Sequence, residues 1–127
     1  MIPSARQLYL AGPMAGLPDH NFPLFNRVAS HLRNAGHTVF NPAANDDGGV
    51  RRERSFYMRL DIPALLKSDA LVLLPGWEQS RGASLEVWLA IDLGLPLYRC
   101  TDADGAILLE RAVDIDLIRL PFLVGEP

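Results

Sequence analysis

Short apolar runs alternate with amphipathic stretches along this chain, a pattern that predicts strands alternating with helices. Strands are expected at residues 7–11, 37–41, 70–74 and 96–100. Between the first two strands, four apolar residues recur at helical spacing, namely Phe25, Val28, Ala29 and Leu32. Asn21 is a favourable residue for the start of that helix, and Gly36 is favourable for its end.

The pattern predicts a second helix within residues 52–68, and a proline interrupts this helix. Pro63 lacks an amide proton and clashes with the preceding turn, so it either kinks the helix or moves its start to about Asp61. The residues expected to face the core are Tyr57, Leu60 and Ala64, with Met58 and Leu65 as further candidates.

A third helix is predicted at residues 84–93, where only Glu86 and Asp92 interrupt an apolar run from Leu85 to Leu93. A helix that is apolar nearly all round is buried on more than one face. We therefore expect one face to cover a sheet and the other to meet a second copy of the chain, in a homodimer or a higher homo-oligomer. After the fourth strand, residues 101–113 are expected to form a short helix, and residues 115–124 an edge strand or an arm around a neighbour.

This alternation predicts a single domain over residues 1–127 with a three-layer α/β, flavodoxin-like (Rossmann-like) fold. The sheet is expected to be parallel through its first four strands, in the order 2-1-3-4-5. Strands one and three are then neighbours, and the loops that follow them, GPMAGL and PGWEQSRGAS, face each other across one crevice. Ligands bind at this edge of open parallel sheets.

Composition excludes several classes of protein. The chain has 127 residues, 49% hydrophobic and 21% charged, and a formal net charge of −3, which argues against a nucleic acid polymer as partner. No apolar run approaches the roughly 18 residues that span a bilayer. The single cysteine, Cys100, allows no internal disulfide and favours a cytoplasmic location.

Sequence motifs exclude several chemistries as well. The chain has no P-loop, no dinucleotide-binding fingerprint and no G-x-S-x-G elbow. Its three histidines and one cysteine lack zinc-ligand spacing. We therefore expect no metal and no cofactor.

Two carboxylates remain as candidates for chemistry in the crevice, Glu86 and Asp61. Paired carboxylates suit glycosyl chemistry, in which one group attacks or stabilises the anomeric carbon and the other handles the proton of the leaving group. Each also has a structural explanation. Glu86, expected in the first helical turn, would favourably face the helix dipole, and Asp61 would cap a helix around Pro63.

Other crevice residues have the same two interpretations. Ser80 and Gly82 at a helix start, with Arg81 between them, suit an anion, and so does the cluster of Arg51, Arg52, Arg54 and Arg59. The alternative for that cluster is a solvated, salt-bridged helix start. Tyr9 and Trp77 are either site residues or packing residues, and Asp69 is expected to be a structural cap.

Three segments together resemble the nucleoside 2-deoxyribosyltransferase superfamily, which includes the deoxynucleoside 5′-monophosphate N-glycosidases. The segments are LYLAGPMAGL, YMRLDIPALLKSDALVLLP and SRGASLEVWLAIDLGLP. An uncharacterised branch found in phages and prophages is most similar, because it shares the AGPMAGLPDHNFPLFN and LLPGWEQSRGASLE segments.

The resemblance implies roles for individual residues. The nucleophilic glutamate of the family falls on Glu86, its second acid on Asp61 and its first-strand tyrosine on Tyr9. The phosphate-binding serine and glycine of the hydrolases fall on Ser80 and Gly82. The remaining substrate-binding candidates are Gly12, Pro13, Met14, Trp77, Arg81 and Ser84.

The resemblance implies cleavage of the N-glycosidic bond of a (deoxy)nucleoside 5′-monophosphate through a glycosyl-enzyme. Where the monophosphate hydrolases carry a serine and an arginine after the first-strand glycine, this chain has Pro13 and Ala15. Two alternatives stay open, a deoxyribosyltransferase that exchanges bases and a non-catalytic module that senses a nucleotide.

Overall fold

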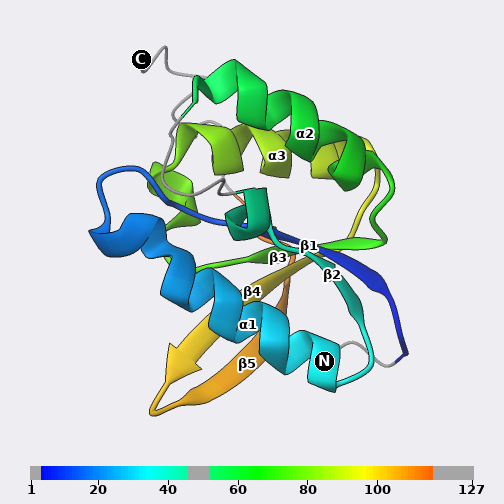
Figure 1. Ribbon diagram of the computed structural model, residues 1–127. Coiled ribbons are helices and arrows are strands. Elements are labelled where there is room, and N and C mark those ends of the chain that lie inside the picture. Colours follow the sequence, from blue (N-terminus) through cyan, green and yellow to red (C-terminus); the bar gives the residue numbers. More distant parts are fainter. Residues whose placement is uncertain (1–3, 46–51, 116–127) are drawn as a thin grey trace.

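The computed structural model describes residues 4–45 and 52–115, which form one five-stranded sheet with helices on both faces (Figure 1). The helices are α1 (Phe22–Asn34), α2 (Arg54–Leu66) and α3 (Arg81–Asp92). The strands are β1 (Gln7–Ala11), β2 (Thr38–Phe40), β3 (Ala70–Leu73), β4 (Leu97–Ala103) and β5 (Ala106–Ala112). Three short 3-10 turns, η1 (Pro18–Asn21), η2 (Pro42–Asn45) and η3 (Trp77–Gln79), complete the order.

The sheet has the predicted order, β2-β1-β3-β4-β5. Strands β1, β2, β3 and β4 pair in parallel, so β1 and β3 lie side by side and their carboxyl ends share one edge. The predicted three-layer, flavodoxin-like fold is therefore confirmed. Alternate strand residues face opposite layers: Leu8 and Leu10 pack with α1, whereas Tyr9 and Ala11 pack on the side of α2 and α3.

Helix α1 forms as its apolar spacing predicts, and Phe25, Val28, Ala29 and Leu32 are its buried residues. Gly36, at φ +100°, ends it in a Schellman motif, with the amide of His37 donating to Leu32 and that of Gly36 to Arg33. Asn21 occupies the N-cap position, but its side chain makes no capping bond. Its amide group instead donates to the carbonyl of Pro13 at 2.9 Å.

Helix α2 is one continuous helix that contains Pro63, so neither a break nor a new start occurs at Asp61. Only Asp61 and Leu65 are buried on it, and Leu60, expected to face the core, is 44% exposed. The prediction for Leu60 was wrong because the buried face of α2 is the one that carries Asp61 and Leu65, four residues apart, and Leu60 lies off that face.

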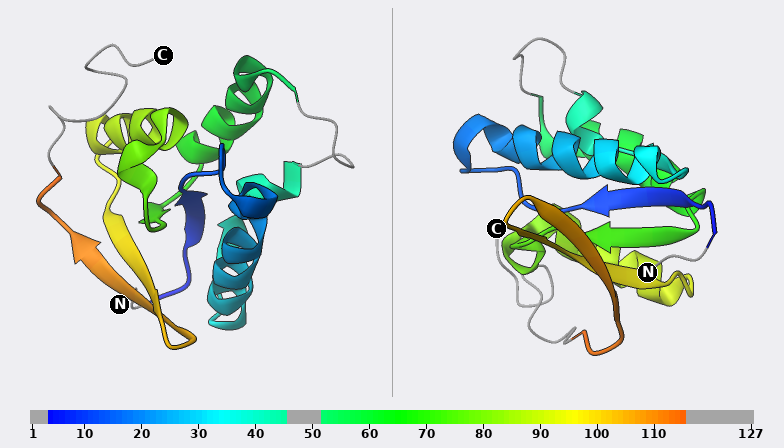
Figure 2. Two further views of the ribbon diagram at one scale, coloured as in Figure 1. Left: turned by 90° about the vertical axis from the view of Figure 1, so that its left-hand side faces the viewer. Right: turned by 90° about the horizontal axis from the view of Figure 1, so that it is seen from below.

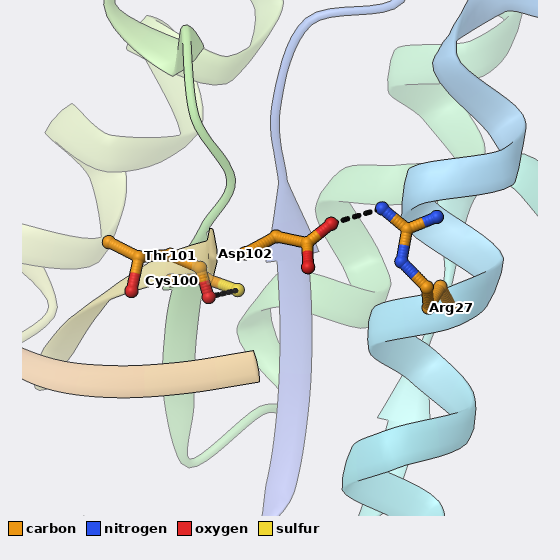
Figure 3. Close-up of polar contacts among 4 residues, drawn as sticks. All are labelled: Arg27, Cys100, Thr101 and Asp102. Atoms are coloured by element: carbon orange, nitrogen blue, oxygen red, sulfur yellow. Dashed lines mark hydrogen bonds and ion pairs between the residues drawn. The ribbon is translucent and has the colours of Figure 1, made fainter. Parts of the chain in front are cut away.

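The helix predicted at residues 101–113 is wrong, because β4 and β5 form an antiparallel hairpin there (Figure 2). Asp104 and Gly105 both have positive φ angles, 53° and 79°, as a two-residue hairpin turn requires. An ion pair between Arg27 of α1 and Asp102 of β4 joins the hairpin to the helical layer (Figure 3). Of the arm or edge strand predicted at residues 115–124, only Ile115 belongs to the described residues.

Candidate active site

A cavity of about 310 Å³ opens at the carboxyl edge of the sheet, where β1, α2 and α3 converge. Its volume lies at the lower end of the range for small-molecule sites. Both predicted carboxylates line it. The full lining is Leu10, Gly12, Met14, Ala15, Phe25, Pro42, Arg52, Arg54, Tyr57, Met58, Asp61, Ser80, Gly82, Ala83 and Glu86.

Glu86 lies in the second turn of α3, because the helix begins at Arg81 and not near Ser84 as expected. The prediction that it occupies the first turn was therefore wrong, and the helix dipole gives no reason for a carboxylate at this depth. Glu86 is only 6% exposed. The hydroxyl of Tyr9 donates to its Oε2 at 2.5 Å, which fixes the orientation of the carboxyl group.

Asp61 lies in the middle of α2 and does not cap a helix. It is 7% exposed, and its Oδ1 accepts a hydrogen bond of 2.8 Å from the side-chain amide of Asn45, at the end of η2. A buried acid with one hydrogen bond, on the wall of a cavity, is an arrangement that stability alone does not explain.

The two acids have raised pKa values. Burial raises the pKa of Glu86 to about 8, opposed by the Tyr9 hydrogen bond, and the charge of Asp61 contributes to the rise while Arg54 lowers it. Burial raises the pKa of Asp61 to about 6, and the bond from Asn45 opposes this. Burial, followed by the charges of Glu86 and Asp61, also raises the pKa of Tyr9, which keeps its proton. Because the acids interact, they titrate as a pair that holds one proton near neutral pH.

The start of α3 contributes polar groups to the same cavity. Ser80 is the N-cap, and its Oγ accepts a hydrogen bond of 3.1 Å from the amide of Ala83. The first-turn amides of Arg81 and Gly82 have no helical acceptor. A Cβ at Gly82 would meet only the sulfur of Met58, at 3.9 Å, so this glycine leaves open space beside those amides.

The first loop contributes backbone and apolar atoms. A Cβ at Gly12 would lie 2.8 Å from the Cβ of Leu74, so only glycine allows β1 and β3 to approach this closely. Met14 and Ala15 also line the cavity, in agreement with the prediction that the loop after β1 faces the crevice. Pro13 does not, and its carbonyl instead anchors the side chain of Asn21.

Besides Pro13, three predicted substrate-binding residues lie outside the cavity lining. Trp77 is 4% exposed and packs in the core on the α3 side of the sheet, which agrees with its packing interpretation. Ser84 is fully buried, and its Oγ has no hydrogen-bond partner among the described residues. Arg81 is exposed at the start of α3. Asp69 is structural as expected, since its Oδ2 accepts from the amide of Gln7 at 2.8 Å.

Helix α2 supplies cavity residues that the sequence assigned elsewhere. Tyr57 and Met58 were expected in the core but line the cavity, beside Arg52 and Arg54 of the arginine cluster. Arg51 of the same cluster lies outside the described residues. Asn45 was missed entirely, because no motif marks it and only the fold brings it to Asp61.

Within residues 4–45 and 52–115, no group of three or more histidine, cysteine, aspartate or glutamate side chains is arranged to hold a metal ion. In the same part of the chain, every helix is too short or too polar to cross a membrane.

Residues 6–99 match the family described as "Domain of unknown function (DUF4406)". The chain belongs to this family. No curated protein matches its sequence significantly. The match covers the cavity lining and strands β1 to β3 and ends within β4.

Three solved structures resemble the chain. A 2-deoxyribosyltransferase from Bacillus psychrosaccharolyticus is 24% identical, with a TM-score of 0.58 over 73% of this chain and 70% of that one. A 2-deoxyribosyltransferase from Leishmania mexicana is 19% identical, with a TM-score of 0.59 over 83% and 78%. A conserved protein from Enterococcus faecalis V583 is 22% identical, with a TM-score of 0.55 over 76% and 63%. At the level of the fold, these findings confirm the resemblance to 2-deoxyribosyltransferases predicted from the sequence, while the phage and prophage branch stays a prediction.

Proposed function

We propose that this domain cleaves the N-glycosidic bond of a (deoxy)nucleoside 5′-monophosphate, with Glu86 as nucleophile and Asp61 as acid. The observation that carries the proposal is the hydrogen bond from Tyr9 to Glu86 at 2.5 Å, in a cavity that a second buried acid also lines. One oxygen of Glu86 is thereby held in place and the other is left for attack. Most enzymes that cleave glycosidic bonds use a pair of carboxyl groups in this way.

The reaction has two steps. A carboxylate oxygen of Glu86 bonds to the anomeric carbon, the carbon–nitrogen bond breaks, and its electron pair leaves with the base. Protonated Asp61 gives its proton to the departing base. Water then attacks the glycosyl-enzyme, Asp61 takes a proton from this water, and the bond to Glu86 breaks to free the sugar.

The protonation of the two acids suits this two-step reaction. Burial raises the pKa of both groups, so near neutral pH the pair holds one proton and one negative charge. The hydrogen bond from Tyr9 and the positive charge of Arg54 both favour the negative charge on Glu86. The reactive form of the pair is the one with the charge on Glu86 and the proton on Asp61, where the departing base needs it.

The monophosphate substrate is supported by Ser80 and Gly82 at the start of α3, whose open backbone suits an oxyanion. Deoxyribosyl transfer between bases is the second candidate. Two proteins with this fold are named 2-deoxyribosyltransferases, and transfer requires only that a second base replace water in the last step.

A panel of deoxyribonucleosides and their monophosphates, each incubated with and without a free acceptor base, tests the proposal by chromatography. We expect base release from monophosphates alone, lost when Ser80 is changed to alanine. Base exchange with unphosphorylated nucleosides would contradict the hydrolase and support the transferase. Binding of a nucleotide with no base released over a day would instead identify a sensing module.

A further inference from the structure

The two helices that line the cavity begin at the same edge of the sheet. Helix α2 leads into β3, α3 connects β3 to β4, and all of these strands are parallel. Helices that return between parallel strands run opposite to them, so α2 and α3 both begin at the carboxyl edge. Their first turns therefore lie at the end of the cavity nearest that edge.

Each helix carries donor groups in its first turn and a carboxylate further along. On α3, Gly82 precedes Glu86 by four residues, about 6 Å along the axis. On α2, Arg54 precedes Asp61 by seven residues, about 10 Å along the axis and on the same face. All four residues line the cavity. The cavity thus has a donor-rich, cationic end and an acidic end.

Arg54 lies at the cationic end of the cavity, away from the two acids, where it could bind an anionic group of a ligand. It lines both the cavity and a second groove, formed by residues of α2 and by Leu85 of α3. Within the described part of the chain, its guanidinium makes no hydrogen bond and no ion pair. A cation at the mouth of a cavity that contains two buried acids is therefore free to bind a ligand.

Arg52 supports the same end of the cavity. Its guanidinium lies over the ring of Phe56, 4.9 Å from the centroid, and its backbone amide donates to the hydroxyl of Tyr57 at 3.0 Å. These contacts hold residue 52 against the first turns of α2.

We propose that Arg54, with Arg52 beside it, forms an anion subsite that binds the 5′-phosphate of the substrate and selects it over the unphosphorylated nucleoside. A guanidinium fork matches two phosphate oxygens and stays charged at every physiological pH. It also offsets the repulsion between a phosphate dianion and the negative charge of the carboxylate pair. Met14 and Ala15, first-loop residues that also line the cavity, offer no side-chain donor.

Two other arginines nearby provide matched controls. Arg59 is on the same helix but lines only the second groove, and Arg81 is exposed at the start of α3 outside the cavity lining. If general positive charge attracted the phosphate, removing either would weaken binding as much as removing Arg54. If the geometry of the cavity selects the phosphate, then among these arginines only the removal of Arg54 or Arg52 should weaken binding.

This subsite rests on the proposed function for its substrate but is tested by binding alone. Calorimetric titration of 2-deoxyribose 5-phosphate and of 2-deoxyribose should show that the wild-type protein prefers the phosphorylated sugar. We expect Arg54→Gln to weaken binding of 2-deoxyribose 5-phosphate roughly 10- to 100-fold without changing that of 2-deoxyribose, the loss typical of one hydrogen bond to a charged group. Arg54→Lys should restore part of the loss, and Arg59→Gln should bind as wild type does.

Two results would overturn the subsite: a wild-type protein without preference for the phosphorylated sugar, or an Arg54→Gln protein that keeps the preference. The proposed function fails separately. If no base is released from any monophosphate while Arg54 still governs the preference for the phosphorylated sugar, the reaction is refuted and the subsite stands. If monophosphates are cleaved equally by wild type and Arg54→Gln, only the subsite is refuted.

Discussion

Tyr9 and Glu86 are 77 positions apart in the sequence, yet the phenol hydroxyl of Tyr9 donates to Oε2 of Glu86 at 2.5 Å. Tyr9 is fully buried in the interior strand β1, and Glu86 points from the second turn of α3 onto the same side of the sheet. The sheet therefore supplies a fixed donor to an acid on a helix. This contact makes Glu86 a positioned carboxylate.

Changing Tyr9 to phenylalanine should slow base release by roughly 10- to 100-fold, because Glu86 loses a hydrogen bond to its charged form. The same bond lowers the pKa of Glu86, so its loss should also move the alkaline limb of the pH profile, near 8, to higher pH. Tyr98→Phe, on the opposite face of the sheet, is the control and should change neither quantity. A Tyr9→Phe protein with the rate and pH profile of wild type would show that the contact is only structural.

The rate of base release should have a bell-shaped dependence on pH, with limbs near 6 and 8, since burial raises the pKa of Asp61 to about 6 and that of Glu86 to about 8. Below the lower limb both acids are protonated and no nucleophile remains, and above the upper limb neither can protonate the base. Asn45→Ala removes the bond that lowers the pKa of Asp61, so the lower limb should move upward. Steady-state kcat/KM between pH 4.5 and 9.5 gives both limbs, and a monotonic profile would rule out the shared proton.

The buried acids should make the protein less stable as pH rises. Glu86 has an ordinary pKa of 4.5 when unfolded and about 8 when folded, so the folded state binds the extra proton between these values. Its contribution to stability is fully present below pH 4.5 and is lost as the pH rises through 8, on the order of 2–4 kcal/mol. Glu86→Gln should therefore melt several degrees above wild type at pH 9 and close to it at pH 4. The exposed Glu78→Gln is the control, and thermal melts in which both variants behave alike would contradict the assignment.

The outer face of α3 is expected to bind a second copy of the chain. Trp88 and Ile91 on this helix are 37% and 38% exposed, beside the partly buried Leu85 and Leu89. Light scattering should report a dimer or larger assembly for wild type and a smaller species for Ile91→Asp, because a charge cannot be buried there without a partner. Leu108→Asp, on the exposed side of β5, should leave the assembly intact. A stable wild-type monomer at micromolar concentration would refute this interface.

Apolar spacing records burial directly, so it predicted the first four strands and the position of α1. The strand order followed from the alternation of strands and helices in a chain of this length. It failed where a local signal competed with that spacing. The apolar residues of β5 suggested a helix, although the Asp104–Gly105 pair marks a hairpin turn. The start of α3 was placed too late because Ser80, its real cap, was interpreted only as an anion ligand.

The two acids of the site were predictable as candidates, since a carboxylate in an otherwise apolar segment demands a reason. Their surroundings were not. Only the tertiary fold brings Asn45 to Asp61 and Arg54 to the cavity, and no short motif encodes either placement. Trp77 and Ser84 were misjudged because proximity in sequence to Glu86 does not determine which side of the loop a residue faces.

The central claim is that Glu86 attacks the sugar, and base release by the Glu86→Gln protein tests it most directly. The substitution keeps the size of the side chain and an acceptor for Tyr9 but removes the nucleophilic charge. Each deoxynucleoside 5′-monophosphate is incubated with wild type or variant, and free base is measured by chromatography. The account predicts that wild type releases base from at least one monophosphate and that the variant does so at least 1000-fold more slowly, as expected for loss of a covalent nucleophile. Release by Glu86→Gln at the wild-type rate would contradict it.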